Sequence, residues 1–495
     1  MRGALMVCGT GSDTGKSHIV TGLCRLLHRR GVRVAPFKAQ NMALNSFVTP
    51  SGHEIGRAQG VQALAAGAVP EVAMNPILLK PTSERTSQVV VMGEPMGHLD
   101  AVEYHAEKPN LLATVLAACD DLRRRFDVVI LEGAGSPTEI NLLDHDIVNL
   151  RVADELGVPA IVVGDIDRGG VFASLYGTVA LLPDRYRALV RAFVINKLRG
   201  DPALLGDGLS ELERRSGVGV LGVLPFVHDV ALDAEDSLAL AGPRPAASGP
   251  PLGDALDIAV VRFPRLANFT DLDALAIEPG VHVRYVETSA ALGRPDLVVL
   301  PGTKATVADL EWLRGTGLDR AVFEGTDALV LGICGGYQLL GRTIVDTVES
   351  GRGHVPALGR LDVDTIFEST KLTRQRRGHA MGQRVAGYEI RHGRVARRDS
   401  TPGWIHLDDC YGHEDDGALD ADARVLGTSM HGLFEQDGFR AAFLTEVGRR
   451  ADKTFVPAGV SFAAARDAQF DRLADLLEAH LDLAALDALI EGAAA

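Results

Sequence analysis

Residues 329–341 read Leu-Val-Leu-Gly-Ile-Cys-Gly-Gly-Tyr-Gln-Leu-Leu-Gly, an apolar run that stops at a cysteine flanked by glycines. The pattern predicts a buried strand, a sharp turn at Cys334 and a helix after it. Gly332, Gly335 and Gly336 suit such a turn, because a strained backbone needs small neighbours that leave the cysteine side chain accessible. A cysteine after an apolar strand is more often a packed core residue, but glycines on both sides favour a thiol nucleophile.

Two other stretches could complete a site around this thiol. His431 follows a second apolar run and could act as the base that activates Cys334. Residues 296–300 form a buried-type strand that ends in a glycine turn at Gly302. The backbone N–H groups of Gly302 and Gly335 are therefore candidates to stabilise an oxyanion. Together these residues predict a site for thiol-based acyl transfer.

A second motif lies at the start of the chain, where residues 4–8 are apolar and residues 9–17 read Gly-Thr-Gly-Ser-Asp-Thr-Gly-Lys-Ser. A helical spacing of apolar residues follows, so the context is that of a phosphate-binding P-loop. Lys16 would neutralise phosphate charge and Ser17 would reach Mg²⁺. The residues expected to surround the phosphates are Gly9, Thr10, Gly11, Asp13, Thr14 and Gly15. The slot six residues before Lys16 holds Thr10 rather than glycine, and a chance glycine turn is the alternative interpretation.

Polar residues follow three more apolar strands of the same half of the chain. Residues 127–131 lead into Glu132 and a glycine turn, residues 159–164 lead into Asp165, and residues 192–195 lead into Asn196. Strands that alternate with helices and end in polar residues predict a parallel, doubly wound sheet with its site along one edge. Glu132 is placed as a Mg²⁺-associated acid would be, although a helix-capping glutamate is the alternative.

The composition shifts to proline, glycine, alanine and serine around residues 241–255, which indicates a linker. A second series of strands and helices begins after it and contains both Cys334 and His431. The predicted fold class is therefore α/β with two doubly wound domains. The predicted boundaries are residues 1–240, the linker 241–255, residues 256–447 and a C-terminal helical segment 448–495. The charged stretches 371–377 and 413–416 are predicted to be solvated loops.

The charge and the apolar content limit the classes of partner. The chain has 495 residues, a net charge of −15 and 46% hydrophobic residues, which argues against nucleic-acid and anionic-membrane binding. An anionic substrate would have to meet a local basic patch. No apolar stretch reaches transmembrane length and the first residues lead straight into a strand, so a cytoplasmic protein is expected. The five cysteines show no C-x-x-C spacing, and apart from Cys334 they are expected to be reduced core residues.

These motifs together resemble the cobyric acid synthase family over essentially the whole chain. The residues that carry the resemblance are 9–17, 36–42 (Pro-Phe-Lys-Ala-Gln-Asn-Met), 74–81 (Met-Asn-Pro-Ile-Leu-Leu-Lys-Pro), 131–136, 164–170, Cys334 and His431. The spacing of the P-loop is that of dethiobiotin synthetase-like enzymes. The resemblance implies such an ATPase domain followed by a class I glutamine amidotransferase domain. It also implies ATP- and glutamine-dependent amidation of the b, d, e and g carboxylates of adenosylcobyrinic acid a,c-diamide, which gives adenosylcobyric acid in cobalamin synthesis.

The resemblance also implies roles for individual residues, with ATP and Mg²⁺ as cofactors and with L-glutamine and the corrinoid as partners. Ser17 and Glu132 would bind Mg²⁺, Asn196 and Lys197 would lie near adenine, and Cys334 with His431 would hydrolyse glutamine. The candidates for a substrate-side role are Lys38, Gln40, Asn41, Lys80, Asp146, Asp165, Asp167 and Arg168. A structural role in the loops at the sheet edge is the alternative for these residues.

Several points stay open at the level of sequence. Many class I amidotransferases place a glutamate two residues after the histidine, but Leu433 occupies that slot here, and nothing in the spacing shows that Glu435 faces the imidazole. A cobyrinic acid a,c-diamide synthase-like amidase is one alternative function. A ParA/MinD-like regulatory ATPase with an inactive amidotransferase-like domain is another. The oligomeric state is also open.

Overall fold

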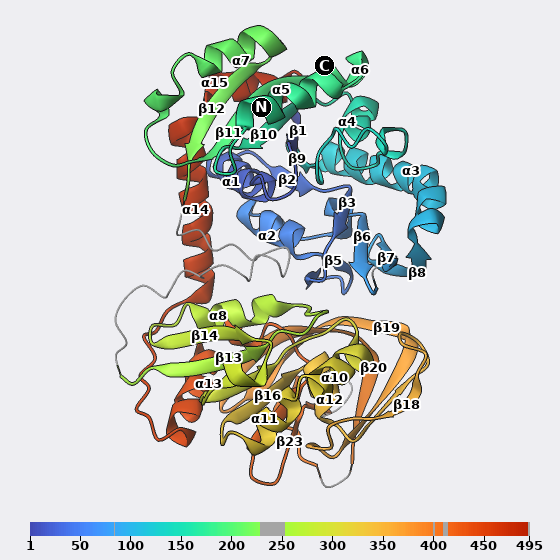
Figure 1. The fold of residues 1–495 in the computed structure, drawn as a ribbon, viewed down its shortest axis with the longest axis vertical. Helices are drawn as coiled ribbons and strands as arrows, with labels where there is room; N and C mark the ends of the chain where they lie inside the picture. Colours follow the sequence, from blue (N-terminus) through green and yellow to red (C-terminus); the bar gives the residue numbers. More distant parts are fainter. Residues whose placement is uncertain (84, 228–252, 399–400, 409–413, 494–495) are drawn as a thin grey trace. The chain divides into compact units, whose positions relative to one another are not determined.

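The computed structural model describes residues 1–495 except 84, 228–252, 399–400, 409–413 and 494–495. Cys410 and most of the predicted linker lie outside the described residues. The chain divides into two compact units (Figure 1). The first comprises residues 1–43, 53–232 and 466–495, and the second comprises residues 44–52 and 233–465. The units differ from the predicted boundaries at three places. Residues 44–52 and residues 448–465 of the predicted C-terminal helical segment belong to the second unit, whereas residues from 466 onward belong to the first.

The first unit is built on a six-stranded parallel sheet with the order β12-β11-β10-β1-β9-β2. Its strands are β1 (Gly3–Gly9), β2 (Val34–Phe37), β9 (Val128–Glu132), β10 (Ala160–Asp165), β11 (Val190–Leu198) and β12 (Gly219–Pro225). Both faces of the sheet carry a buried apolar cluster, which explains why the strands read as continuous hydrophobic runs. This α/β architecture confirms the predicted fold class for the first half of the chain.

Helices cover both faces of this sheet. The helices whose residues lie mainly in the first unit are α1 (Lys16–Arg29), α2 (Arg57–Ala65), α3 (Ala101–Arg125), α4 (Leu150–Leu156), α5 (Val171–Leu181), α6 (Asp184–Arg187), α7 (Gly208–Ser216), α14 (Phe462–His480) and α15 (Leu483–Glu491). α14 begins in the second unit and ends in the first, where Phe470 and Leu477 join the same apolar cluster as α1. The end of the chain thus contributes to the core of the first domain.

A smaller sheet extends the first unit, with the order β3-β6-β7-β8. Its strands are β3 (Gln40–Met42), β6 (Ile77–Pro81), β7 (Thr86–Val91) and β8 (Glu94–Asp100), and β5 (Glu54–Gly56) lies nearby in sequence. α3 begins directly after β8, where the Asp100 side chain accepts hydrogen bonds from the N–H groups of Val102 and Glu103. No helix in the described part of the chain combines the length and apolar character needed to cross a membrane.

The second unit contains a six-stranded sheet with the order β14-β13-β15-β16-β24-β23, in which only β23 is antiparallel. Its strands are β13 (Leu256–Val261), β14 (Val281–Val286), β15 (Leu297–Leu300), β16 (Leu329–Ile333), β23 (Ala418–Leu419) and β24 (Val425–Thr428). Its helices are α8 (Asp273–Ala276), α9 (Ser289–Leu292), α10 (Thr306–Gly315), α11 (Leu318–Glu324), α12 (Gly335–Leu340) and α13 (Asp437–Arg450). Apolar clusters again lie on both faces, which confirms the second predicted α/β domain.

A mixed sheet completes the second unit, with the order β18-β17-β19-β21-β22 and β20 paired with β19. Its strands are β17 (Thr343–Asp346), β18 (Gly353–Pro356), β19 (Val363–Ala380), β20 (Gln383–Arg397), β21 (Ile405–Leu407) and β22 (Glu414–Asp416), and β4 (Ser46–Val48) also belongs to this unit. The prediction that residues 371–377 form a solvated loop is wrong, because they lie inside β19 and Arg376 is buried. Residues 414–416 form β22 and Asp416 is buried, while His413 lies outside the described residues.

Candidate active sites

The predicted nucleophile lies on a tight turn between β16 and α12. Cys334 has φ 51° and ψ −105°, a conformation that costs a non-glycine residue about 1–3 kcal/mol and is concentrated at functional sites. The turn packs so closely that a Cβ on Gly336 would lie 1.8 Å from the Leu300 carbonyl oxygen. The glycine is therefore required by contact with β15. The Cys334 Sγ lies 3.8 Å from the Ile390 carbonyl oxygen of β20.

His431 follows β24 and is held on three sides. Its backbone exchanges two hydrogen bonds with Tyr388, and its ring stacks on the Tyr388 ring at a centroid distance of 5.2 Å. Its Nδ1 lies 2.7 Å from Asp271 Oδ2, and the second carboxylate oxygen of Asp271 accepts a hydrogen bond from the Gly432 N–H. All of these groups are buried. Asp271 therefore orients the imidazole and holds a proton on Nδ1.

Asp271 is the carboxylate that sequence reasoning missed. It lies in the short 3-10 helix Phe269–Leu272, 160 residues before His431, and is therefore far in sequence from Leu433 and Glu435. The sequence does contain an indication of this role, because Asp271 belongs to the connection that follows the apolar strand β13. Connections after parallel strands gather at one edge of the sheet, so an acid there was a candidate partner.

The surroundings of His431 change its protonation. Burial alone would lower the pKa of the imidazole, but the charge of Asp271, the neighbouring Cys334 and hydrogen bonds to both raise that pKa to about 10. The imidazole is therefore protonated at neutral pH in the absence of substrate. A protonated imidazole stabilises negative charge on an adjacent sulfur, which is the reactive form of a cysteine.

The two predicted oxyanion residues lie against the same groups. A Cβ on Gly302 would lie 3.1 Å from the His431 Cε1 atom and 2.7 Å from the Ala267 carbonyl oxygen. A Cβ on Gly335 would lie 2.6 Å from Thr303 Cγ2. The turn after β15 and the turn after β16 therefore meet at the nucleophile, and the fold brings Gly302, Gly335 and His431 together around Cys334.

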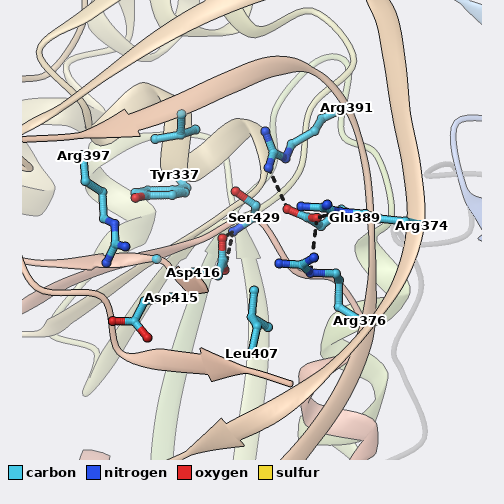
Figure 2. A pocket seen from close by; sticks show the side chains of 12 residues that line it. Tyr337, Arg374, Arg376, Glu389, Arg391, Arg397, Leu407, Asp415, Asp416 and Ser429 are labelled. Atoms are coloured by element: carbon cyan, nitrogen blue, oxygen red, sulfur yellow. Dashed lines mark hydrogen bonds and ion pairs between the residues drawn. The ribbon is translucent and has the colours of Figure 1, made fainter. Parts of the chain in front are cut away.

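The second unit also contains a polar pocket, whose lining includes sequence neighbours of Cys334 and His431 (Figure 2). It is lined by Tyr337, Arg374, Arg376, Glu389, Arg391, Val395, Arg397, Leu407, Asp415, Asp416, Gly417 and Ser429. Tyr337 lies three residues after Cys334, and Ser429 lies two residues before His431. Figure 2 shows Arg374, Arg376 and Arg391 converging on Glu389. Among these arginines, Arg391 lies close enough to Cys334 for their charges to interact.

The charges in this pocket are stabilised by one another. Burial opposes ionisation of Glu389, but Arg391 and Arg374 hold the pKa of this carboxyl below its usual range. Burial likewise opposes the charge of Arg391, yet Glu389, Asp416 and Cys334 raise the pKa of that guanidinium. Burial raises the pKa of Asp416, whose side chain accepts hydrogen bonds from Thr428 and from the Ser429 N–H. The pocket therefore presents guanidinium groups and carboxyl groups side by side.

In the first unit, the predicted P-loop joins β1 to α1. Gly15 has φ 99°, and a Cβ there would lie 2.1 Å from the Asn196 side chain. Lys16 Nζ donates hydrogen bonds to the carbonyl oxygens of Gly11 and Gly135, at 2.8 Å and 3.1 Å. Asp13 also adopts a positive φ of 58°. The lysine thus spans the loop, as expected for a group that meets phosphate charge.

Glu132 lies at the end of β9, beside the P-loop. Its Oε1 accepts hydrogen bonds from Ser17 Oγ at 2.8 Å and from Lys38 Nζ at 2.9 Å, and its Oε2 accepts one from Gln62. Burial raises the pKa of this carboxyl, but Lys38 and the hydrogen bonds have a larger, opposite effect. The pKa of Glu132 therefore lies below its usual range. A hydroxyl and an ionised carboxylate at this spacing fit the hard oxygen ligands of Mg²⁺. Gln62 was not among the predicted residues.

Asn196 and Lys197 lie next to the P-loop at the end of β11. Asn196 Nδ2 donates to the Thr14 carbonyl oxygen at 2.9 Å, and Lys197, with φ 64°, donates to Asp165 at 2.8 Å. Asp167 pairs with Arg199, and Arg168 lies 3.4 Å from Asp13. Asp165 and Asp167 therefore each form an ion pair within the loops at the strand ends. Such pairs fit the alternative interpretation, in which these aspartates have a structural role.

The remaining candidates are dispersed over the first unit. Asp146 accepts the N–H groups of Val148 and Asn149 just before α4, which is the geometry of a turn before a helix. Lys80 pairs with Glu54 at 2.7 Å, and both are buried. Gln40 accepts a hydrogen bond from Tyr104, and Asn41 donates to Gln59. Lys38 contacts Glu132, as described above.

Comparison with known proteins agrees with both halves of this geometry. Residues 5–239 match the model of the CobQ/CobB/MinD/ParA nucleotide binding domain, and residues 257–439 match that of the CobB/CobQ-like glutamine amidotransferase domain. The chain is 52% identical to cobyric acid synthase of Rhodococcus jostii (strain RHA1), over 99% of this chain and 96% of that protein. It is 53% identical to the Saccharopolyspora erythraea enzyme of the same name and 52% identical to that of Streptomyces coelicolor, covering 99% and 100% of this chain and 95% and 97% of the relatives.

The predicted resemblance is therefore confirmed over nearly the full length of the chain, in the nucleotide-binding half and the amidotransferase half alike. The chain belongs to the cobyric acid synthase family.

Proposed function

We propose that this protein amidates the b, d, e and g carboxylates of adenosylcobyrinic acid a,c-diamide, with glutamine as nitrogen source and ATP as energy source. The observation that carries the proposal is the presence, in one chain of this family, of the Cys334–His431–Asp271 group and of a P-loop beside Glu132. The first arrangement can release ammonia from an amide, and the second can activate a carboxylate.

In the amidotransferase half, the Cys334 sulfur attacks the side-chain amide carbon of glutamine. His431 gives a proton to the departing nitrogen, so that ammonia leaves and a thioester remains. The N–H groups of Gly302 and Gly335 stabilise the negative oxygen of the tetrahedral intermediate. His431 then takes a proton from water, which hydrolyses the thioester to glutamate and restores the thiol. Asp271 acts through His431 by fixing its orientation.

The polar pocket beside Cys334 is suited to the amino-acid end of glutamine. Its guanidinium groups, Arg391 foremost, would bind the α-carboxylate, and the carboxyl groups of Glu389 and Asp416 would bind the α-ammonium. Such a zwitterion requires both signs of charge within one small pocket. The pairing of opposite charges around Glu389 supports this assignment.

In the synthetase half, a carboxylate of the corrinoid attacks the γ-phosphorus of ATP, which gives an acyl phosphate and ADP. Lys16 neutralises the charge that develops on the phosphate oxygens. Ser17 and Glu132 would hold Mg²⁺, which when bound supplies positive charge against the phosphates. Ammonia then attacks the acyl carbon and phosphate leaves. Release of AMP and pyrophosphate instead of ADP and phosphate would contradict this route.

Mass spectrometry of the corrinoid tests the proposal directly. Each conversion of a carboxylic acid to an amide lowers the mass by about 1 Da, so incubation with ATP and glutamine is expected to give four successive losses. An enzyme of the a,c-diamide synthase type would leave the a,c-diamide unchanged. A regulatory ATPase would form neither an amide nor glutamate. Either result would refute the proposal.

A further inference from the structure

The turn after β15, residues 301–303, carries the predicted oxyanion donor Gly302 and meets the turn after β16 at the nucleophile. We propose that Asp309 is a positioning residue for glutamine hydrolysis, because it holds Thr303 and with it the distance between these two turns. The inference deepens the proposed function, on which it rests. It assigns a role to a buried carboxyl that the mechanism of the amidotransferase half does not use.

Asp309 lies in the first turn of α10 and is buried, with an exposed fraction of 1%. Its Oδ2 accepts a hydrogen bond from the Thr303 hydroxyl and another from the Arg265 N–H, the latter at 3.3 Å. The Thr303 hydroxyl oxygen in turn accepts a hydrogen bond from the Ala305 N–H at 3.0 Å. One carboxyl therefore joins the start of α10, the turn after β15 and the connection after β13.

The ionisation of Asp309 fixes the direction of these hydrogen bonds. Burial raises the pKa of this carboxyl to about 6, although hydrogen bonds from Thr303 and Arg265 oppose the rise. Asp309 is therefore mostly ionised at neutral pH, and a carboxylate can only accept hydrogen bonds. The Thr303 hydroxyl must then donate to Asp309 and accept from Ala305, which leaves the Thr303 side chain a single orientation. The backbone at Thr303 is thus tied to α10.

Thr303 is the residue of this turn that packs against the turn at the nucleophile. A Cβ on Gly335 would lie 2.6 Å from Thr303 Cγ2 and 2.9 Å from the Thr303 backbone nitrogen. The two turns also share a backbone hydrogen bond, which the Gly336 N–H donates to the Pro301 carbonyl oxygen at 3.1 Å. If the bond to Asp309 is lost, the backbone at Thr303 can move away from Gly335. The two predicted oxyanion donors would then shift relative to each other.

The connection after β13 holds the opposite side of the same turn. The Ala267 N–H donates to the Gly302 carbonyl oxygen at 2.9 Å, and a Cβ on Gly302 would lie 3.1 Å from His431 Cε1. The Arg265 N–H of this connection is the second donor to Asp309. Misplaced oxyanion donors weaken the transition state more than the binding of glutamine. Loss of the Asp309 contact should therefore lower kcat and leave KM nearly unchanged.

The test measures kcat and KM for glutamate release by the full chain, with glutamine, ATP and the corrinoid present. Thr303→Val keeps the shape of the side chain and removes the hydroxyl, and we expect kcat to fall about tenfold or more with KM within about twofold. Asp309→Ala should show the same pattern, whereas Asp309→Asn keeps an oxygen for both donors and should retain kcat within about threefold. The variant that combines Thr303→Val with Asp309→Ala should lose no more than the more severe single variant, because both changes break one contact.

Thr343→Val is the matched control, because the Thr343 hydroxyl donates to Asp364 at 2.5 Å between β17 and β19. It is expected to keep kcat within about twofold. A kcat of Thr303→Val within about twofold of the unaltered protein, an equal loss in Thr343→Val, or additive losses in the combined variant would overturn the role of Asp309.

Amidation with added ammonia separates this inference from the proposed function. All variants are expected to use ammonia within about twofold of the unaltered protein, because oxyanion stabilisation at Cys334 is not needed when ammonia is supplied. Glutamate release by the unaltered protein without amide from either nitrogen source would refute the proposed function, while the kcat values for glutamate release would still decide the role of Asp309. Absence of both glutamate and amide would refute the two proposals together.

Discussion

The replacement Asp271→Asn tests the assignment of Asp271 as the residue that orients His431. The Gly432 N–H needs an oxygen on residue 271, so the new amide would direct its nitrogen at His431 Nδ1. An amide nitrogen can only donate, which would move the imidazole proton to Nε2, the nitrogen required to exchange protons with the thiol. The variant would keep the shape of the site and lose the correct tautomer.

The magnitude follows from the bond that is lost. The hydrogen bond between Asp271 and His431 is buried, is 2.7 Å long and joins two charged groups. Such bonds contribute about 1.5–3 kcal/mol, which corresponds to roughly a 10- to 150-fold loss in kcat/KM for glutamine. Removing the carboxylate also removes a group that raises the pKa of His431 to about 10. The alkaline limb of the pH profile should therefore move to lower pH.

The assay is glutamate release as a function of pH, with ammonia-dependent amidation as an internal measure of folding and of the synthetase half. Glu435→Gln is the matched control, because Glu435 is the carboxylate closest to His431 in the following sequence. It is expected to keep activity within about twofold. Glutamate release by Asp271→Asn within twofold of the unaltered protein, or an equal loss in Glu435→Gln, would refute the assignment of Asp271.

Three further predictions concern the two half-sites. Cys334→Ser should abolish glutamine-dependent amidation but keep amidation with ammonia at alkaline pH. Lys16→Met should abolish amidation with both donors. Formation of the amide product from ammonia by Lys16→Met would contradict this prediction. Glu132→Gln should lose amidation with either donor and respond only weakly to Mg²⁺ titration, while basal glutamate release persists; normal Mg²⁺ dependence would exclude Glu132 as a ligand. Because the folded-state pKa of His431 is raised to about 10 from about 6.5, its stabilising contribution is complete below pH 6.5 and is lost as the pH rises toward 10. The difference in unfolding free energy between the unaltered protein and Asp271→Asn should therefore narrow over that range, and a constant difference would contradict the assignment.

The two α/β domains, the strained turn at Cys334, the P-loop and the family could all be predicted from the order of the amino acids. These features could be predicted because each depends on a continuous run of residues whose local backbone conformation is limited by glycine or by hydrophobic periodicity. Gly336, for example, is required by contact with β15, yet its presence beside Cys334 already indicated a tight turn. Local patterns of this kind can be interpreted without knowing the order of the strands in the sheet.

The contacts between side chains that are distant in the sequence could not be predicted in this way. Asp271 contacts His431 because β13, β15, β16 and β24 are neighbours, in that order, as parallel strands of one sheet. The connections that follow these strands are far apart in the sequence but lie at the same edge of the sheet. The arginine-lined pocket forms because β19 and β20 pair and place Arg374 and Arg391 around Glu389. The stretch expected to be a solvated loop is part of β19 and buries Arg376. Residues 44–52 likewise belong to the second unit, although their position in the sequence suggests the first. Strand order and register are set by the packing of the whole core, and no local run of residues encodes them.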